Sequence, residues 1–75
     1  MHLSEFLEPF DPNVVCYLNC YKEQVDITTG LRWDERIVNR YGRIGEIPMK
    51  YAYGEIKNVY QESESSPLRI DIKLK

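Results

Sequence analysis

The chain is poor in the residues from which catalytic and metal sites are most often built. It has one histidine and two cysteines among 75 residues. The histidine, His2, lies beside the N-terminus, so no serine or cysteine has an evident partner base for nucleophilic catalysis. A metal site at Cys16-x-x-x-Cys20 would need two further ligands. We therefore expect a protein that is not an enzyme, with no catalytic residue, no metal site and no cofactor.

Two cysteines are also too few for a disulfide framework. On one strand, Cys16 and Cys20 would stand about 13 Å apart, which is beyond disulfide reach. We predict two buried, reduced thiols, because free cysteine usually packs as a small hydrophobe. No apolar run approaches the ~20 residues of a membrane span, and the chain does not begin with a basic segment followed by an apolar one. These features favour a cytoplasmic protein without a membrane partner.

Glycine is scarce as well, and phosphate-binding loops are missing. The pair Gly42-x-x-Gly45 lacks the third glycine and the strand-to-helix setting of a dinucleotide-binding loop, and there is no Gly-Lys-Ser/Thr sequence. The net charge is −2 and the pI is about 5.3. The overall electrostatic field therefore does not favour approach to a nucleic-acid backbone. Any contact with nucleic acid would need a local basic patch.

The clearest feature that is present is an alternation of apolar and charged residues over residues 68–75. Successive side chains of a strand point to opposite faces, so this pattern predicts a half-buried β-strand. A stripe of apolar residues at helical spacing over residues 3–10 predicts a short helix with Ser4 as its N-cap, ended by Pro9. The expected core face of the last strand is formed by Leu68, Ile70, Ile72 and Leu74.

The central part of the chain is less regular. Two sets of side chains alternate over residues 14–21, and this alternation predicts a first strand. Its second face carries Tyr17 and Tyr21, which form either another core layer, as we expect, or a contact surface. Residues 22–34 are turn-like at both ends and predict a long or irregular connection. Residues 35–44 read as a second strand broken at Gly42, and a helix over 34–41 is the rival prediction.

The remaining elements complete a small sheet. Pro48 is suited to begin a helical turn that reaches Tyr51. Residues 54–62 predict a third strand, bulged because Ile56 and Val59 are three apart. The sequence thus predicts one α+β domain, residues 1–75. In it a short N-terminal helix packs on an antiparallel sheet of three to five strands ending in a C-terminal hairpin.

Arginine is concentrated in one segment. In residues 31–45, four arginines against two carboxylates give a net charge of +2, whereas five carboxylates against one lysine give −4 in residues 1–30. Arginine interleaved with aromatic residues is typical of protein-interface hot spots and of single-stranded nucleic-acid platforms. It also occurs on ordinary solvated strands whose arginine stems cover apolar surface. The candidate contact residues are Trp33, Arg36, Arg40, Tyr41, Arg43, Tyr51 and Tyr53.

Four segments together resemble small accessory proteins of Firmicutes phages and prophages. They are Leu-x-Glu-Phe-Leu-x-x-Phe-Asp-Pro-Asn at 3–13, Gly-x-Ile-x-Glu-Ile-Pro at 42–48, Glu-Ile-Lys-x-Val at 55–59 and the alternating end at 68–74. Some proteins of this kind are counter-defence inhibitors, such as anti-CRISPR proteins, that bind a host protein or occupy a nucleic-acid site. The resemblance implies a non-enzymatic protein that binds a host macromolecule.

Three functions remain open from the sequence. The first is binding to a host protein in the cytosol through the arginine and aromatic residues of the central segment. The second is a small nucleic-acid-binding β domain that uses the same arginines, with Tyr17 or Tyr21 as stacking groups. The third is an oligomeric structural or scaffolding protein, because an exposed strand can pair across a two-fold axis.

Overall fold

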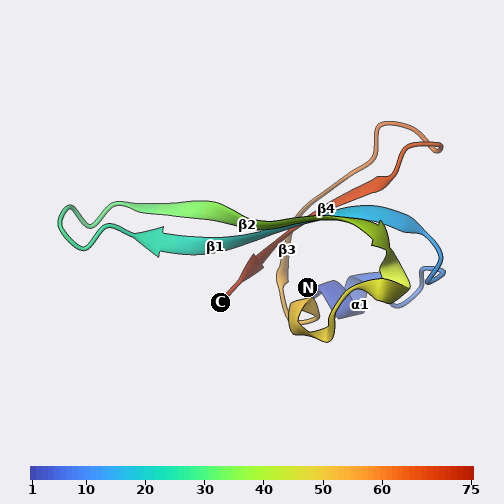
Figure 1. The fold of residues 1–75 in the computed structure, drawn as a ribbon, viewed down its shortest axis with the longest axis horizontal. Coiled ribbons are helices and arrows are strands. Elements are labelled where there is room, and N and C mark those ends of the chain that lie inside the picture. The colour runs from blue at the N-terminus through green and yellow to red at the C-terminus, as the bar shows by residue number, and fades with distance from the viewer.

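A computed structural model describes all 75 residues, and Figure 1 shows a four-stranded sheet from which one long hairpin projects. The single α-helix is short, and two 3₁₀ turns lie between the second and third strands. The elements in chain order are α1 (Leu3–Leu7), β1 (Val15–Val25), β2 (Arg32–Arg43), η1 (Ile44–Glu46), η2 (Met49–Tyr51), β3 (Glu55–Tyr60) and β4 (Leu68–Leu74).

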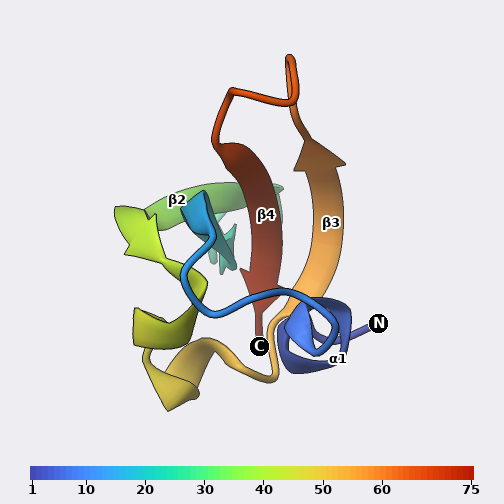
Figure 2. The ribbon, with the colours of Figure 1, turned by 90° about the vertical axis from the view of Figure 1, so that its right-hand side faces the viewer.

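The sheet is mixed, with the strand order β2-β1-β4-β3. β1 pairs antiparallel with β2 and parallel with β4, and β3 pairs antiparallel with β4. The prediction of an antiparallel sheet was therefore wrong for one of the three pairings. Apolar alternation fixes the faces of a strand and says nothing about the direction of its neighbours. That direction follows from residues 44–54, which cross from the β2 edge of the sheet to the β3 edge (Figure 2).

The sheet does not end in a C-terminal hairpin as predicted, because β4 is an interior strand, held between β3 and β1. The loop over residues 61–67 joins β4 to β3, with which it pairs antiparallel. The residues that face the core from β4 are nevertheless those that the alternation over residues 68–75 predicted. Leu68, Ile70 and Ile72 are buried, and Leu74 is partly buried against them.

The core lies between one face of the sheet and the segments that cover it, which are α1, η1 and η2. Cys16, Leu18 and Cys20 of β1 pack there beside Ile70 and Ile72 of β4. Both cysteines are free and buried, as predicted. Burial raises the pKa of the Cys20 thiol to about 11, because it disfavours the thiolate. The other core residues are Leu3, Ile44, Tyr51 and Leu68.

Backbone hydrogen bonds hold the N-terminus against the start of β3. Leu3 N–H donates to the Gly54 carbonyl at 2.9 Å, and Ile56 N–H donates to the Met1 carbonyl at 3.0 Å. The helix is shorter than predicted, and its N-cap lies two residues before the predicted Ser4. Its N-cap is His2, whose N–H donates to Glu5 Oε1 at 3.2 Å, and it ends at Leu7 because the following turn leads into Pro9.

The predicted irregular connection over residues 22–34 is instead part of a long hairpin. β1 continues to Val25, and β2 begins at Arg32, so neither the helix over 34–41 nor the strand break at Gly42 is present. Gly30, with φ at +76°, closes the turn by donating its N–H to the Asp26 carbonyl at 2.7 Å. The strands were missed because neither face of this part is buried, so the sequence has no apolar period there.

Two smaller predictions are confirmed. The third strand carries an irregularity in its pairing with β4, between Ile56 and Asn58. A 3₁₀ turn follows Pro48 and ends at Tyr51. Both features shape the end of the sheet where α1 packs.

Candidate functional site

The outer part of the β1–β2 hairpin, residues 23–34, projects beyond the rest of the sheet, and we call it the arm (Figure 1). The pairing of β1 with β4 ends at Lys22, so only two strands continue past that point. None of the arm's residues is buried. A two-stranded ribbon without a covering layer adds little to the core. Its length is therefore not explained by the stability of the rest of the protein, which we call the body.

The tip of the arm is apolar on both sides. The exposed fraction is 97% for Ile27 and 67% for Leu31 in the turn, 47% for Val25 and 50% for Trp33. Val25 lies on the face of the sheet that α1 leaves open, whereas Trp33, opposite Gln24, lies on the other face. Exposed apolar residues that gather in one place mark interaction surfaces more often than isolated ones do.

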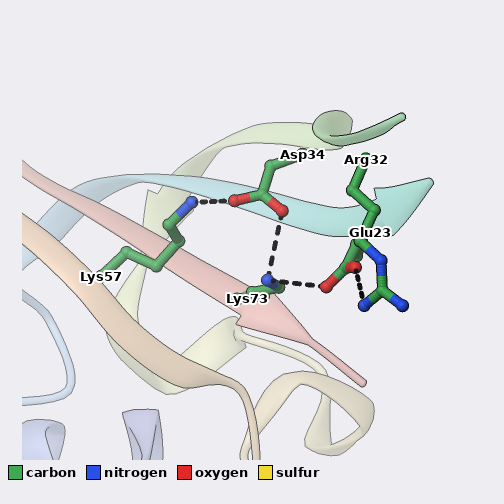
Figure 3. Close-up of polar contacts among 5 residues, drawn as sticks. All are labelled: Glu23, Arg32, Asp34, Lys57 and Lys73. Carbon is green, nitrogen blue, oxygen red and sulfur yellow. Dashed lines mark hydrogen bonds and ion pairs between the residues drawn. The ribbon is translucent and has the colours of Figure 1, made fainter. Parts of the chain in front are cut away.

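Five charged side chains of alternating sign form a chain at the base of the arm (Figure 3). Lys57 donates to Asp34, and Lys73 Nζ lies 3.2 Å from both Asp34 Oδ1 and Glu23 Oε2. Glu23 Oε1 in turn accepts from Arg32 Nη1 at 3.1 Å. The chain joins side chains of all four strands on the open face. It ties one side of the arm's base to the body.

The network shifts the titration of its members in the expected directions. Hydrogen bonds from Lys57 and then Lys73 lower the pKa of Asp34, since they stabilise its carboxylate. Hydrogen bonds to Asp34 and Glu23 raise the pKa of Lys73. All the pairs are partly exposed to solvent, so salt will weaken them. They orient the arm more than they stabilise the fold.

The open face of the sheet carries a row of large side chains that crosses all four strands. In register, Tyr41, Tyr17, Arg69 and Tyr60 stand side by side. The rings of Tyr17 and Tyr41 have centroids 4.6 Å apart, and the Arg69 guanidinium lies 5.0 Å from the Tyr17 ring centroid. The expected core layer at Tyr17 and Tyr21 was therefore wrong, because α1, η1 and η2 cover only the other face.

The next row across the open face is polar. Asn19 Nδ2 donates to Asp71 Oδ1 at 3.0 Å, and Asn39 and Asn58 flank this pair on β2 and β3. The Asn19 Oδ1 atom is buried and accepts no hydrogen bond. In these two rows the open face thus presents aromatic rings, a cation and amides. They contain no aliphatic layer that a second sheet or helix would have to cover.

The structure separates the predicted contact residues into two groups. Arg36, Tyr41 and Arg43 are exposed along the open-face side of β2, and Trp33 lies on the arm. Arg40, on the opposite side, donates from Nη1 to the Glu46 carbonyl at 3.1 Å. The two that lie elsewhere are Tyr51, which is 8% exposed and belongs to the core, and Tyr53, which is exposed beside His2.

Sequence reasoning missed the apolar tip and the far half of the aromatic row. Ile27 and Leu31 flank Thr28-Thr29-Gly30, and two apolar residues beside a turn are a signal for an exposed hairpin tip once the hairpin is recognised. Arg69 and Tyr60 join the row only through the strand order. No local pattern in the sequence encodes that order.

Comparisons with protein-family models, with curated proteins and with solved structures found no match to this chain. The candidate site therefore depends on geometry alone. No three or more His, Cys, Asp or Glu side chains are grouped so as to hold a metal ion. None of the helices is long and apolar enough to cross a membrane.

One edge of the sheet is unoccupied over a long stretch. β2 is an outer strand of 12 residues that pairs only with β1. No backbone hydrogen bond joins residues 32–43 to any segment other than β1. The other outer strand, β3, is partly covered, since Met1 and His2 bond to its start. The two edges of the sheet thus differ in how much free backbone they present.

Proposed function

We propose that this protein is a non-enzymatic binding protein that attaches to another protein through its arm. The observation that carries the proposal is the projecting, uncovered hairpin whose tip exposes Val25, Ile27, Leu31 and Trp33. A ribbon that is apolar on both faces is suited to enter a cleft, because insertion covers both faces at once. Tryptophan is among the residues most enriched at interface hot spots.

The resemblance to phage and prophage accessory proteins supports a host protein as the partner. In that setting the protein acts in the host cytosol, and blocking a host defence component, as anti-CRISPR proteins do, is the effect we infer. The arm supports this inference because filling a cleft on an enzyme or a complex is a direct way to inhibit it. A protein of this size needs no chemistry of its own to do so.

The test is affinity capture from the lysate of a Firmicutes host with three versions of the chain. The parent is compared with Ile27→Asp/Leu31→Asp, and Met49→Asp serves as the matched control, since Met49 is an exposed apolar residue on the body. The proposal expects one host protein that the parent and the control retain and the tip variant loses. Equal recovery of that protein by all three would place the contact outside the arm.

A second candidate function is binding of single-stranded nucleic acid by the open face. The row Tyr41, Tyr17, Arg69 and Tyr60 supports it, because aromatic side chains stack on bases and arginine contacts phosphate. Tyr41 and Tyr60 lie three strand spacings apart, about 14 Å, so two bases of one strand would reach both. Against it, Glu62 and Glu64 follow β3 in the loop at that end of the sheet.

This second function has its own assay. Fluorescence anisotropy with a labelled oligothymidylate would give binding that weakens steeply with salt and is lost in Tyr41→Ala/Tyr60→Ala. Trp33→Ala would leave that binding unchanged, since Trp33 is on the arm. The absence of binding at low salt would remove this candidate.

A further inference from the structure

We propose that the free edge of β2 binds an acidic, extended segment of the partner protein as a fifth strand of the sheet. The inference rests on the proposed function, a protein that binds another protein, and adds the chemistry of the segment bound. It differs from the apolar contact at the tip in both place and driving force.

The backbone of β2 supplies the first argument. In an antiparallel pair, residues alternate between those that bond to the neighbour and those that point away from it. Because β1 is the only partner of β2, the outward half of its N–H and C=O groups has no partner in the chain. Addition of a strand to such an edge is a common mode of peptide recognition, in which main-chain hydrogen bonds give affinity.

Charge supplies the second argument. Arg36 and Arg43 are exposed on the open-face side of β2, and neither forms an ion pair. Arg40 faces the other side. By contrast, both ends of the network at the arm's base are already neutralised, since Arg32 and Lys57 have carboxylate partners. In an added strand along β2, a carboxylate opposite Arg43 would lie beside that arginine, and one near the other end of the strand would lie toward Arg36.

The irregularity in β2 limits where the strand can lie. The pairing of β1 with β2 shifts between Cys20 and Tyr21, which leaves Ile37 without an opposite residue. Bulges of this kind interrupt further pairing and protect edges from self-association. The regularly paired run after it, residues 38–43, is therefore the part of the edge that accepts the segment, with Arg43 in this run and Arg36 just beyond the bulge. The bulge also disfavours a second copy of β2 as the occupant.

The experiment uses the full chain and the probe peptide Ac-Thr-Glu-Val-Glu-Val-Glu-Thr-NH₂. Its counterpart with lysine in place of glutamate is the charge control. We expect binding of the acidic peptide in ¹H–¹⁵N NMR titrations, with shifts confined to β2 and slowed hydrogen exchange at alternate residues of 38–43. The lysine peptide is expected not to bind.

The variant Arg36→Glu/Arg43→Glu should weaken binding of the acidic peptide by about tenfold or more. Lys50→Glu/Lys75→Glu makes the same change in net charge away from β2, and it should leave the Kd within about twofold. An equal loss of affinity in the two double variants would mean that charge attraction alone holds the peptide, and so would binding without slowed hydrogen exchange at alternate residues of β2. Either result would overturn the inference.

Failure of the inference about the β2 edge can be distinguished from failure of the proposed function. No peptide binding, together with tip-dependent capture of a host protein, would overturn the edge inference and leave the arm as the contact. Dimerisation of the parent through β2, seen by light scattering and lost in the double arginine variant, would identify a second copy as the occupant and would equally overturn it.

Discussion

The body and the arm should respond very differently to truncation of one large apolar side chain. Leu18 is fully buried in β1, between Arg40 of β2 and Ile70 of β4 in register, whereas Trp33 is 50% exposed on the arm. Leu18→Ala would leave a cavity in the only core of the protein. Buried leucine-to-alanine changes cost about 2–5 kcal/mol.

That cost is large against the whole stability of the domain. At roughly 0.05–0.15 kcal/mol per residue, 75 residues correspond to about 4–11 kcal/mol. In a domain of this size, 1 kcal/mol moves the Tm by about 4–8 °C, so a loss of about 3 kcal/mol lowers it by roughly 12–24 °C. Trp33→Ala removes no core contact, and we expect less than about 1 kcal/mol.

Thermal and urea unfolding followed by far-ultraviolet circular dichroism would measure both variants. The expected result is a much lower midpoint for Leu18→Ala and a midpoint near that of the parent for Trp33→Ala. If the tryptophan change were as costly as the leucine change, the arm would have to pack against the body. The reasoning that treats its apolar tip as free surface would then be refuted.

Three further predictions concern titration, reactivity and packing. The pKa of Asp34 is lowered in the fold, so its contribution to stability is present above its unfolded value near 3.8 and is lost as the pH falls through the folded value. As the pH is lowered from 5 to 2, the urea midpoint should thus fall less steeply in Asp34→Asn than in the parent. Part of the pH dependence should remain in this variant, because the pKa of Asp26 is also lowered. Because the pKa of Cys20 is about 11 against an ordinary 9.0, its thiolate fraction at pH 8 is about 100-fold smaller. Ellman's reagent should therefore react far faster in urea than in buffer, and equal rates would contradict its burial. In Gly54→Ala the new Cβ would lie 2.5 Å from Ile72 Cδ1, so we expect a loss of about 1–3 kcal/mol in urea unfolding.

The sequence predicted the parts of the fold in which one face is buried. The alternation in β4 and the apolar file in β1 indicated the correct inward residues, because burial imposes a period of two on a strand. The helix, the Pro48 turn and the bulge in β3 were recognised from local patterns of the same kind. The α+β class followed from these elements.

Strand order, strand direction and the arm could not be predicted in this way. The parallel pairing of β1 with β4 joins residues about 52 positions apart, such as Leu18 and Ile70, and depends on how residues 44–54 cross the sheet. The arm is solvated on both faces, so nothing in residues 22–34 imposes an apolar period. The arginines of β2 were recognised as a group, but their place on a free edge was visible only in the assembled sheet.

The most direct test of the central claim is site-specific photo-crosslinking in host cells. A benzoylphenylalanine placed at Ile27, the most exposed apolar residue of the arm, is compared with one placed at Met49 on the body. The account predicts a single crosslinked host protein from position 27, absent from position 49 and lost when Trp33 is also changed to alanine. Crosslinks from position 49 alone, or none from the arm in cells that contain the folded protein, would contradict it.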